Sequence, residues 1–148
     1  MNVSIKPMTE KDAAAVAEIS SLSFSSPWST ESYVQEIKNP VSLYLIAIIG
    51  DKIVGFIGTW NVLDESHITN VAVHPDFRQL KIGSLLLESL INVCQANYNT
   101  AIFDLEVRKS NIAAQKLYLK YNFIENGIRK GYYADNKEDA VLMCRISK

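Results

Sequence analysis

The chain has 148 residues, and its 15 Lys and Arg nearly balance its 16 Asp and Glu, which gives a formal net charge of −1. This length suits one domain, residues 1–148, that needs no disulfide or structural metal to fold, and the hydrophobic fraction of 48% with a charged fraction of 21% excludes disordered and collagen-like proteins. The near-zero charge argues against a broad basic surface, so we expect no nucleic-acid partner.

Alternating and helical patterns of apolar residues divide the chain into short strands and helices, without a linker or an internal repeat. The expected elements are, in chain order, a strand at 3–6, a helix at 12–20, a helix from 30 to about 38, strands at 43–49, 53–62 and 66–73, a helix from 82 to about 96, a strand at 101–107, a helix that follows residue 111, and strands at 123–128 and 140–146. Thr9 with Asp12, Ser29 and Asn111 are expected to cap the helices that follow them. This order predicts an α/β (α+β) fold, in which one mixed sheet of about seven strands carries helices on both faces.

The cysteines and the N-terminal residues favour a cytoplasmic protein. Cys94 and Cys144 belong to no CxxC pair or Cys/His cluster, so we expect neither a disulfide framework nor a metal site. The N-terminal residues lack the apolar stretch of a secretory signal. The longest apolar run, 43–49, is far shorter than the about 20 residues of a membrane-spanning helix, so we expect no membrane partner. His67 and His74 have no clear role in the sequence and are interpreted as structural.

The loop between the strand at 66–73 and the helix that begins at Ile82 has the features of an anion site. Free backbone N–H groups and the positive end of the helix dipole meet at such a helix start. This geometry binds phosphate with few basic side chains, and Arg78 and Lys81 add positive charge. The alternative is an ordinary strand–loop–helix connection with a solvated Arg and Lys.

The same segment resembles a known family. Arg78-x-x-Lys81-x-Gly83, which follows Val71-Ala72-Val73, is similar to the acetyl-CoA loop of the GNAT N-acetyltransferases, Arg/Gln-x-x-Gly-x-Gly/Ala. Lys81 stands where the first Gly of that pattern is usual. Because Lys tolerates a positive φ less well than Gly, we expect Lys81 to have a negative φ and to place its ammonium group near the phosphates.

Four further stretches resemble the ribosomal-protein-alanine N-acetyltransferases (RimI type) and occur in the same order. They are Phe24-Ser25-Ser26-Pro27-Trp28-Ser29, Leu105-Glu106-Val107-Arg108-Lys109-Ser110-Asn111, the segment from Lys116-Leu117-Tyr118 to Tyr121-Asn122-Phe123, and Gly131-Tyr132-Tyr133 followed by Glu138-Asp139-Ala140 and Met143. Asn122 replaces a usual Gly and tolerates the left-handed helix end that Gly provides. The resemblance spans about residues 5–143. It implies the GNAT fold and transfer of an acetyl group to a protein's N-terminal amine, with the N-terminal alanine of small-subunit ribosomal protein eighteen as the usual acceptor.

The resemblance also implies which residues bind acetyl-CoA as cosubstrate. The family's cofactor contacts fall on Val71, Ala72, Val73, Arg78, Gln79, Leu80, Lys81, Ile82, Gly83, Ser84 and Asn111. Main-chain groups of the first segment would bind the pantetheine arm, and one N–H would polarise the thioester carbonyl. The backbone amides of 79–84 would surround the pyrophosphate. Asn111 would act as a helix cap, as a cofactor contact, or as both.

Acetyl transfer to an amine needs a proton acceptor for the amine and benefits from a proton donor for the departing thiolate. The resemblance implies that Glu106 is the general base and that Tyr118, whose phenol is protonated at neutral pH, is the general acid. The residues alone allow other roles. Glu106 would pair with Arg108 on a solvated strand face, and Tyr118 would be a core aromatic on the apolar stripe of its helix.

Trp28, Tyr132 and Tyr133 are either walls of an acceptor cleft or ordinary packing residues. Two other functions stay open besides N-terminal acetylation. One is a GNAT acetyltransferase that acts on a small-molecule amine or a lysine side chain, against which the stretches 24–29 and 138–143 count. The other is a non-catalytic acyl-CoA-binding module, against which the presence of both Glu106 and Tyr118 counts.

Overall fold

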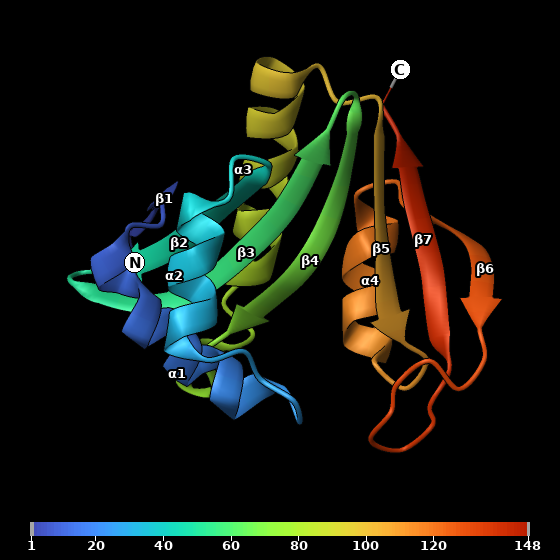
Figure 1. Ribbon diagram of the computed structural model, residues 1–148, viewed down its shortest axis with the longest axis horizontal. Coiled ribbons are helices and arrows are strands. Elements are labelled where there is room, and N and C mark those ends of the chain that lie inside the picture. The colour runs from blue at the N-terminus through green and yellow to red at the C-terminus, as the bar shows by residue number, and fades with distance from the viewer. Residues whose placement is uncertain (1, 148) are drawn as a thin grey trace.

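A computed structural model describes residues 2–147 of the chain (Figure 1). Within that range the strands are β1 (Val3–Pro7), β2 (Ser42–Ile49), β3 (Lys52–Val62), β4 (Glu65–Val73), β5 (Ile102–Arg108), β6 (Ile124–Arg129) and β7 (Ala140–Ile146). The helices are α1 (Ala13–Ser23), α2 (Thr30–Lys38), α3 (Ile82–Tyr98) and α4 (Ile112–Lys120), with the short 3-10 turns η1 (Glu10–Asp12) and η2 (Pro75–Phe77). The expected mixed seven-stranded sheet is confirmed, although α1 continues to Ser23 instead of ending at Ser20.

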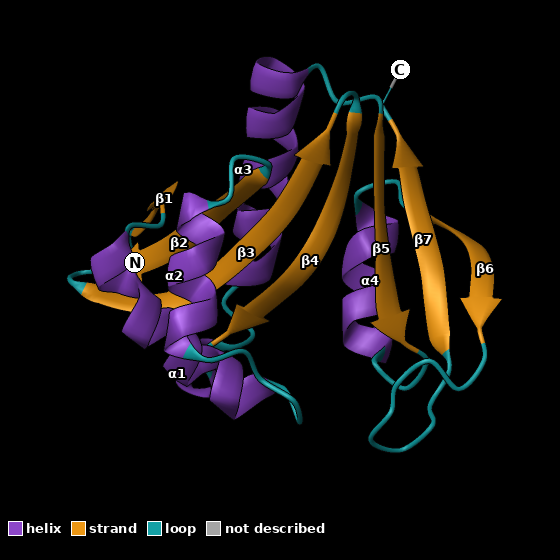
Figure 2. Cartoon of the chain, viewed as in Figure 1, coloured by secondary structure: helices purple, strands orange, loops and turns teal. Residues whose placement is uncertain are grey.

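The described strands form one sheet in the order β1-β2-β3-β4-β5-β7-β6. Every neighbouring pair is antiparallel except β4 and β5, which are parallel and are joined by the crossover helix α3. In the described chain these two strands pair at only three positions, the last of which is His67 with Asp104. A bulge at Thr69 bends β4 just beyond this point. Figure 2 shows the two strands close together at one end and well apart at the other.

Helices cover both faces of the sheet, as the sequence predicts. α1 and α2 lie on one face, and α3 and α4 lie on the other (Figure 1). Successive β3 residues point to opposite faces, so Phe56 packs with Tyr33 of α2 while Ile57 packs with Leu86 and Leu90 of α3. Each helix pair therefore has its own apolar core, and the sheet separates the two cores.

The three predicted helix caps are confirmed. The Thr9 N–H donates to the Asp12 carboxylate at 2.8 Å and begins η1. The Ser29 hydroxyl accepts the Ser32 N–H at 3.1 Å at the start of α2, and the Asn111 side chain accepts a backbone N–H at 3.1 Å at the start of α4. Asn122 has a φ of 71°, which confirms its left-handed conformation after α4.

No helix in residues 2–147 is long and apolar enough to cross a bilayer.

Candidate active site

The divergence of β4 and β5 opens a cavity of about 380 Å³. The two strands contribute residues 68–71 and 105–108 to its walls. The segment before α2 closes one side through Phe24 and Trp28, and α4 closes the other through Ala114 and Tyr118. Residues from helices on both faces of the sheet therefore line the same cavity.

The cavity brings together residues that lie far apart in the sequence. Of the expected site residues, its lining contains Val71, Glu106, Asn111 and Tyr118. The other expected cofactor residues lie outside its lining, along the carboxyl-terminal part of β4, in the loop after it and at the start of α3.

Of the three aromatic residues expected at an acceptor cleft, the structure places two in the cavity. Trp28 and Tyr133 line it. Tyr132 does not, because its ring packs against Tyr133 at 5.1 Å between centroids and against the Arg129 guanidinium at 5.6 Å.

Glu106 lies beside a histidine and not beside Arg108. The Nε2 atom of His67 is 3.4 Å from Oε1 of Glu106, and its Nδ1 atom is 2.6 Å from Oδ1 of Asp104. Hydrogen bonds to Asp104 and then to Glu106 raise the pKa of His67 to about 9, and the hydrogen bond from His67 lowers the pKa of Glu106. At neutral pH the site therefore holds an imidazolium and an ionised Glu106.

The alternative pairing of Glu106 with Arg108 is wrong. The Arg108 guanidinium binds Asp135 at 2.9 Å and Glu138 at 3.3 Å, and it stacks on the Tyr133 ring at 4.0 Å. Although both side chains project from one face of β5, Arg108 turns toward the loop between β6 and β7. It thereby fixes that loop beside the cavity.

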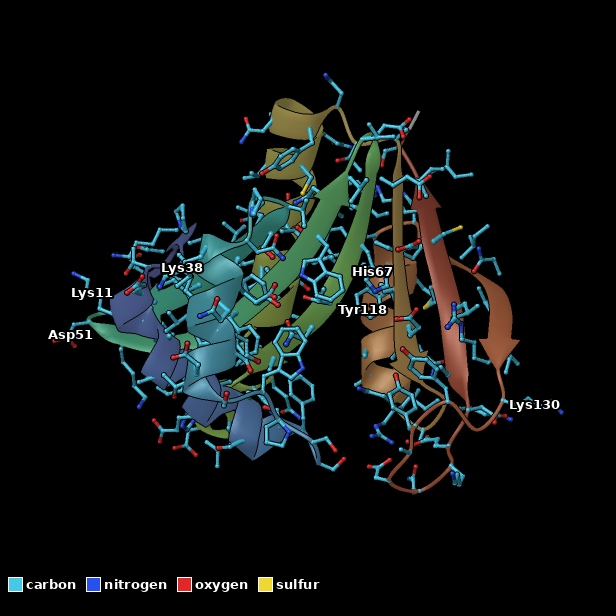
Figure 3. The ribbon with its side chains drawn as sticks, viewed as in Figure 1. Lys11, Lys38, Asp51, His67, Tyr118 and Lys130 are labelled. Atoms are coloured by element: carbon cyan, nitrogen blue, oxygen red, sulfur yellow. The ribbon has the colours of Figure 1, made fainter. Side chains whose placement is uncertain are left out.

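The sequence assigns no role to His67, and the structure places it between two carboxylates, one of which is Glu106. Its partners lie on β5, so its role depends on the pairing of β4 with β5. The signal in the sequence was a lone histidine on a strand, which does not show its carboxylate partners. Figure 3 labels His67 at β4 and Tyr118 on α4. Within residues 2–147, no group of three His, Cys, Asp or Glu side chains is placed to bind a metal.

Tyr118 is a core aromatic residue that also borders the cavity. Its side chain is buried and packs against Phe123 at 5.5 Å between ring centroids, as a core aromatic does. It also lines the cavity. Burial raises the pKa of Tyr118, so the phenol keeps its proton at neutral pH.

The loop before α3 contradicts one expectation. Lys81 has a φ of 65° and not a negative value, and Gln79 has a φ of 64°. The turn from η2 into α3 requires left-handed backbone, and it overrides the preference of Lys for negative φ. The cost of such a conformation is about 1–2 kcal/mol for a residue with a Cβ.

The start of α3 fits a phosphate group. The backbone amides of 79–84 have no acceptor among the described residues, and the first turn of α3 holds no acidic side chain. The side chain of Lys81, the N-cap residue, makes no capping hydrogen bond. A Cβ at Gly83 would meet Leu117 at 3.5 Å and Val73 at 4.0 Å, which are ordinary contacts. The protein's own packing therefore does not require glycine there, whereas the close approach of a ligand to the backbone would.

The edge of β4 that faces the cavity has free backbone groups. The His74 N–H donates to Val54 of β3 at 2.7 Å, so by alternation the N–H groups of Val71 and Val73 point away from β3. The Ala72 side chain points to the opposite face of the sheet, where it is buried against the core under α1 and α2. Arg78 folds back onto this edge, donating to the Val73 carbonyl at 3.0 Å. The Arg78 side chain thus positions the loop as well as adding charge.

The family of the chain follows from its similarity to known proteins. The Acetyltransferase (GNAT) family profile matches residues 13–123. A Bacillus subtilis protein, provisionally named a [ribosomal protein bS18]-alanine N-acetyltransferase, is 39% identical over 140 residues, which are 94% of this chain and 92% of that protein. The [ribosomal protein bS18]-alanine N-acetyltransferase of Salmonella typhimurium is 35% identical and covers 94% of both chains. The crystal structure of the ribosomal-protein-S18-alanine N-acetyltransferase from Escherichia coli superposes with a TM-score of 0.91 at 33% identity, over 99% of this chain and 96% of that one. The chain therefore belongs to the GNAT family and is an acetyltransferase.

Proposed function

We propose that the chain transfers the acetyl group of acetyl-CoA to the N-terminal α-amine of a protein, and that its acceptor is the N-terminal alanine of ribosomal protein bS18. The names of relatives that match over nearly their full length support this acceptor. The observation that carries the proposal is the cavity between β4 and β5, whose lining contains both Glu106 and Tyr118.

The chain's own backbone would hold acetyl-CoA. The free amides of 79–84 would bind the pyrophosphate at the start of α3. The N–H groups of Val71 and Val73, which point away from β3, would hold the pantetheine arm, and one of them would polarise the thioester carbonyl. Asn111 would contact the cofactor from the cavity wall.

Glu106 and Tyr118 would supply the proton transfers. An N-terminal α-amine has a pKa near 7.7–8.0, so an appreciable fraction is neutral and ready to attack at physiological pH. Once the nitrogen bonds to the carbonyl carbon, the ionised Glu106 would take its proton directly or through a water. Tyr118 would donate to the thiolate as the C–S bond breaks, because burial disfavours an earlier loss of its proton.

A peptide pair tests this function against its alternatives. One peptide begins with alanine and has a free α-amine, and the other has the same sequence with a blocked N-terminus and a lysine. We expect kcat/KM to be measurable for the first and negligible for the second. Comparable acetylation of the blocked peptide would favour a side-chain or small-amine acetyltransferase. Binding of acetyl-CoA in calorimetry without turnover of any amine would favour a non-catalytic acyl-CoA-binding module.

A further inference from the structure

His67 occupies the point at which the central strands part. It is the last β4 residue that pairs with β5, where it lies opposite Asp104. On its other side β4 pairs with β3, and the Trp60 ring lies 6.3 Å from the imidazole. Three strands therefore fix the position of this side chain, and the cavity begins immediately beyond it.

Both ring nitrogens of His67 face carboxylates. The Nδ1 atom is hydrogen-bonded to Asp104 at 2.6 Å, and the Nε2 atom lies at ion-pair distance from Glu106, at 3.4 Å. A neutral imidazole carries one N–H only, so it suits one of these two carboxylates at a time. An imidazolium suits both, in agreement with a His67 pKa of about 9. Trp60, the neighbour from β3, is uncharged, and Arg129 of β6 is a further cation that lowers the pKa of Glu106.

His67 and Glu106 differ in their access to the reaction. Glu106 lines the cavity, whereas His67 is not among the described residues that line it. The imidazole contacts Oε1 of Glu106, and Oε2 has no hydrogen-bond partner among the described residues. We propose that His67 is a positioning residue, whose imidazolium form holds Glu106 ionised and aims its free oxygen at the acceptor amine. This inference rests on the proposed role of Glu106 as general base.

A double-mutant cycle tests whether His67 acts through Glu106. We expect His67→Gln to lower kcat by about tenfold to a hundredfold, the range for losing a hydrogen bond to a charged group, with the KM for acetyl-CoA unchanged. In a chain that already carries Glu106→Gln, His67→Gln should cause no further loss. Losses that multiply in the double variant would overturn the assignment.

The pH dependence gives a readout that a merely structural histidine would not move. The ratio of wild-type to His67→Gln activity should stay constant up to about pH 8 and fall toward one as pH rises through about 9, because the wild type then loses its imidazolium. A ratio that stays the same at pH 7.5 and pH 10 would contradict the proposal. If His67→Gln does not fold, Asp104→Asn replaces it. The ratio of wild-type to Asp104→Asn activity should also fall toward one as pH rises through about 9.

Nuclear magnetic resonance separates this inference from the proposed function, because it needs no turnover. The chain has two histidines, so a His74→Gln background leaves His67 as the one imidazole to observe. Its ¹⁵N signals should titrate near pH 9, and Glu106→Gln should move the midpoint to lower pH. A midpoint near the ordinary value of about 6.5, insensitive to Glu106→Gln, would overturn the inference even in an active enzyme. If the His67 midpoint lies near pH 9 and moves in Glu106→Gln but the enzyme acetylates no N-terminal amine, the result would instead count against the proposed function.

Discussion

Tyr118 fills space in the core and also borders the cavity, so its ring and its hydroxyl group can be tested separately. Phe preserves the ring and its contact with Phe123. If the hydroxyl group donates the proton, Tyr118→Phe should lower kcat by about 10²–10⁴, with stability and acetyl-CoA affinity preserved. Tyr121→Phe on the next turn is a matched control that should change kcat little. A Tyr118→Phe enzyme with a normal rate would assign this residue to packing alone.

The left-handed conformation of Lys81 lowers the stability of the fold, so glycine should be tolerated or favoured at this position. We expect Lys81→Gly to raise the free energy of unfolding by up to about 1 kcal/mol in chemical denaturation, because glycine removes the strain but gives the unfolded chain more conformational entropy. As a control, Lys116→Gly at an exposed position in the middle of α4 should lower the free energy of unfolding by about 1 kcal/mol. The affinity for acetyl-CoA should change by no more than about tenfold, roughly 1.4 kcal/mol. A much larger loss of affinity would make the Lys81 ammonium group an essential ligand.

The charge on His67 also links stability to pH. Its pKa is raised from about 6.5 to about 9 on folding, so its ion pairs stabilise the fold fully below about pH 6.5 and cease to do so as pH rises through about 9. We expect the difference in unfolding free energy between wild type and His67→Gln to shrink from pH 6 to pH 10. A difference in unfolding free energy that stays the same from pH 6 to pH 10 would contradict a charged His67.

At the level of single elements, local sequence carries most of the information. β7 has the expected bounds, and Ser29 and Asn111 cap α2 and α4 as expected, because each of these features depends on neighbouring residues. The end of α1 was harder to place, since nothing in the serine-rich segment after Ser20 forbids helix and the chain becomes extended only at Phe24. The prediction of a negative φ at Lys81 was wrong, because the geometry of the turn sets this residue's backbone conformation and the residue type does not.

Substitution of Gly83 in the first turn of α3 should have opposite effects on stability and on acetyl-CoA affinity. Gly83 has a negative-φ helical backbone with room for a methyl group, so Gly83→Ala should stabilise the chain by up to about 1 kcal/mol. The added Cβ would stand where the pyrophosphate approaches the backbone, so the affinity for acetyl-CoA should fall, and Gly83→Val should weaken it further. Calorimetry beside thermal denaturation measures both effects. An unchanged affinity in Gly83→Val would place the phosphates elsewhere.

For the whole molecule, the sequence predicts the elements and the layers but not the contacts between distant strands. The parallel pairing of β4 with β5 and the strand order β5-β7-β6 are set by packing across the sheet, which no local pattern reports. The cavity and the contact between His67 and Glu106 follow from that pairing. The sequence points to Glu106 and Tyr118 only through the resemblance of the stretches around them to a known family.

Intact ribosomal protein bS18 with a free N-terminus provides the most direct test of N-terminal acetylation by this chain. The protein is incubated with the enzyme and acetyl-CoA, and tandem mass spectrometry then locates each acetyl group. We expect one acetyl group on the α-nitrogen of the N-terminal alanine with the wild-type enzyme, and a far slower reaction with Glu106→Gln. Acetyl groups on lysine side chains, or an unmodified N-terminus although acetyl-CoA binds, would contradict the proposed function.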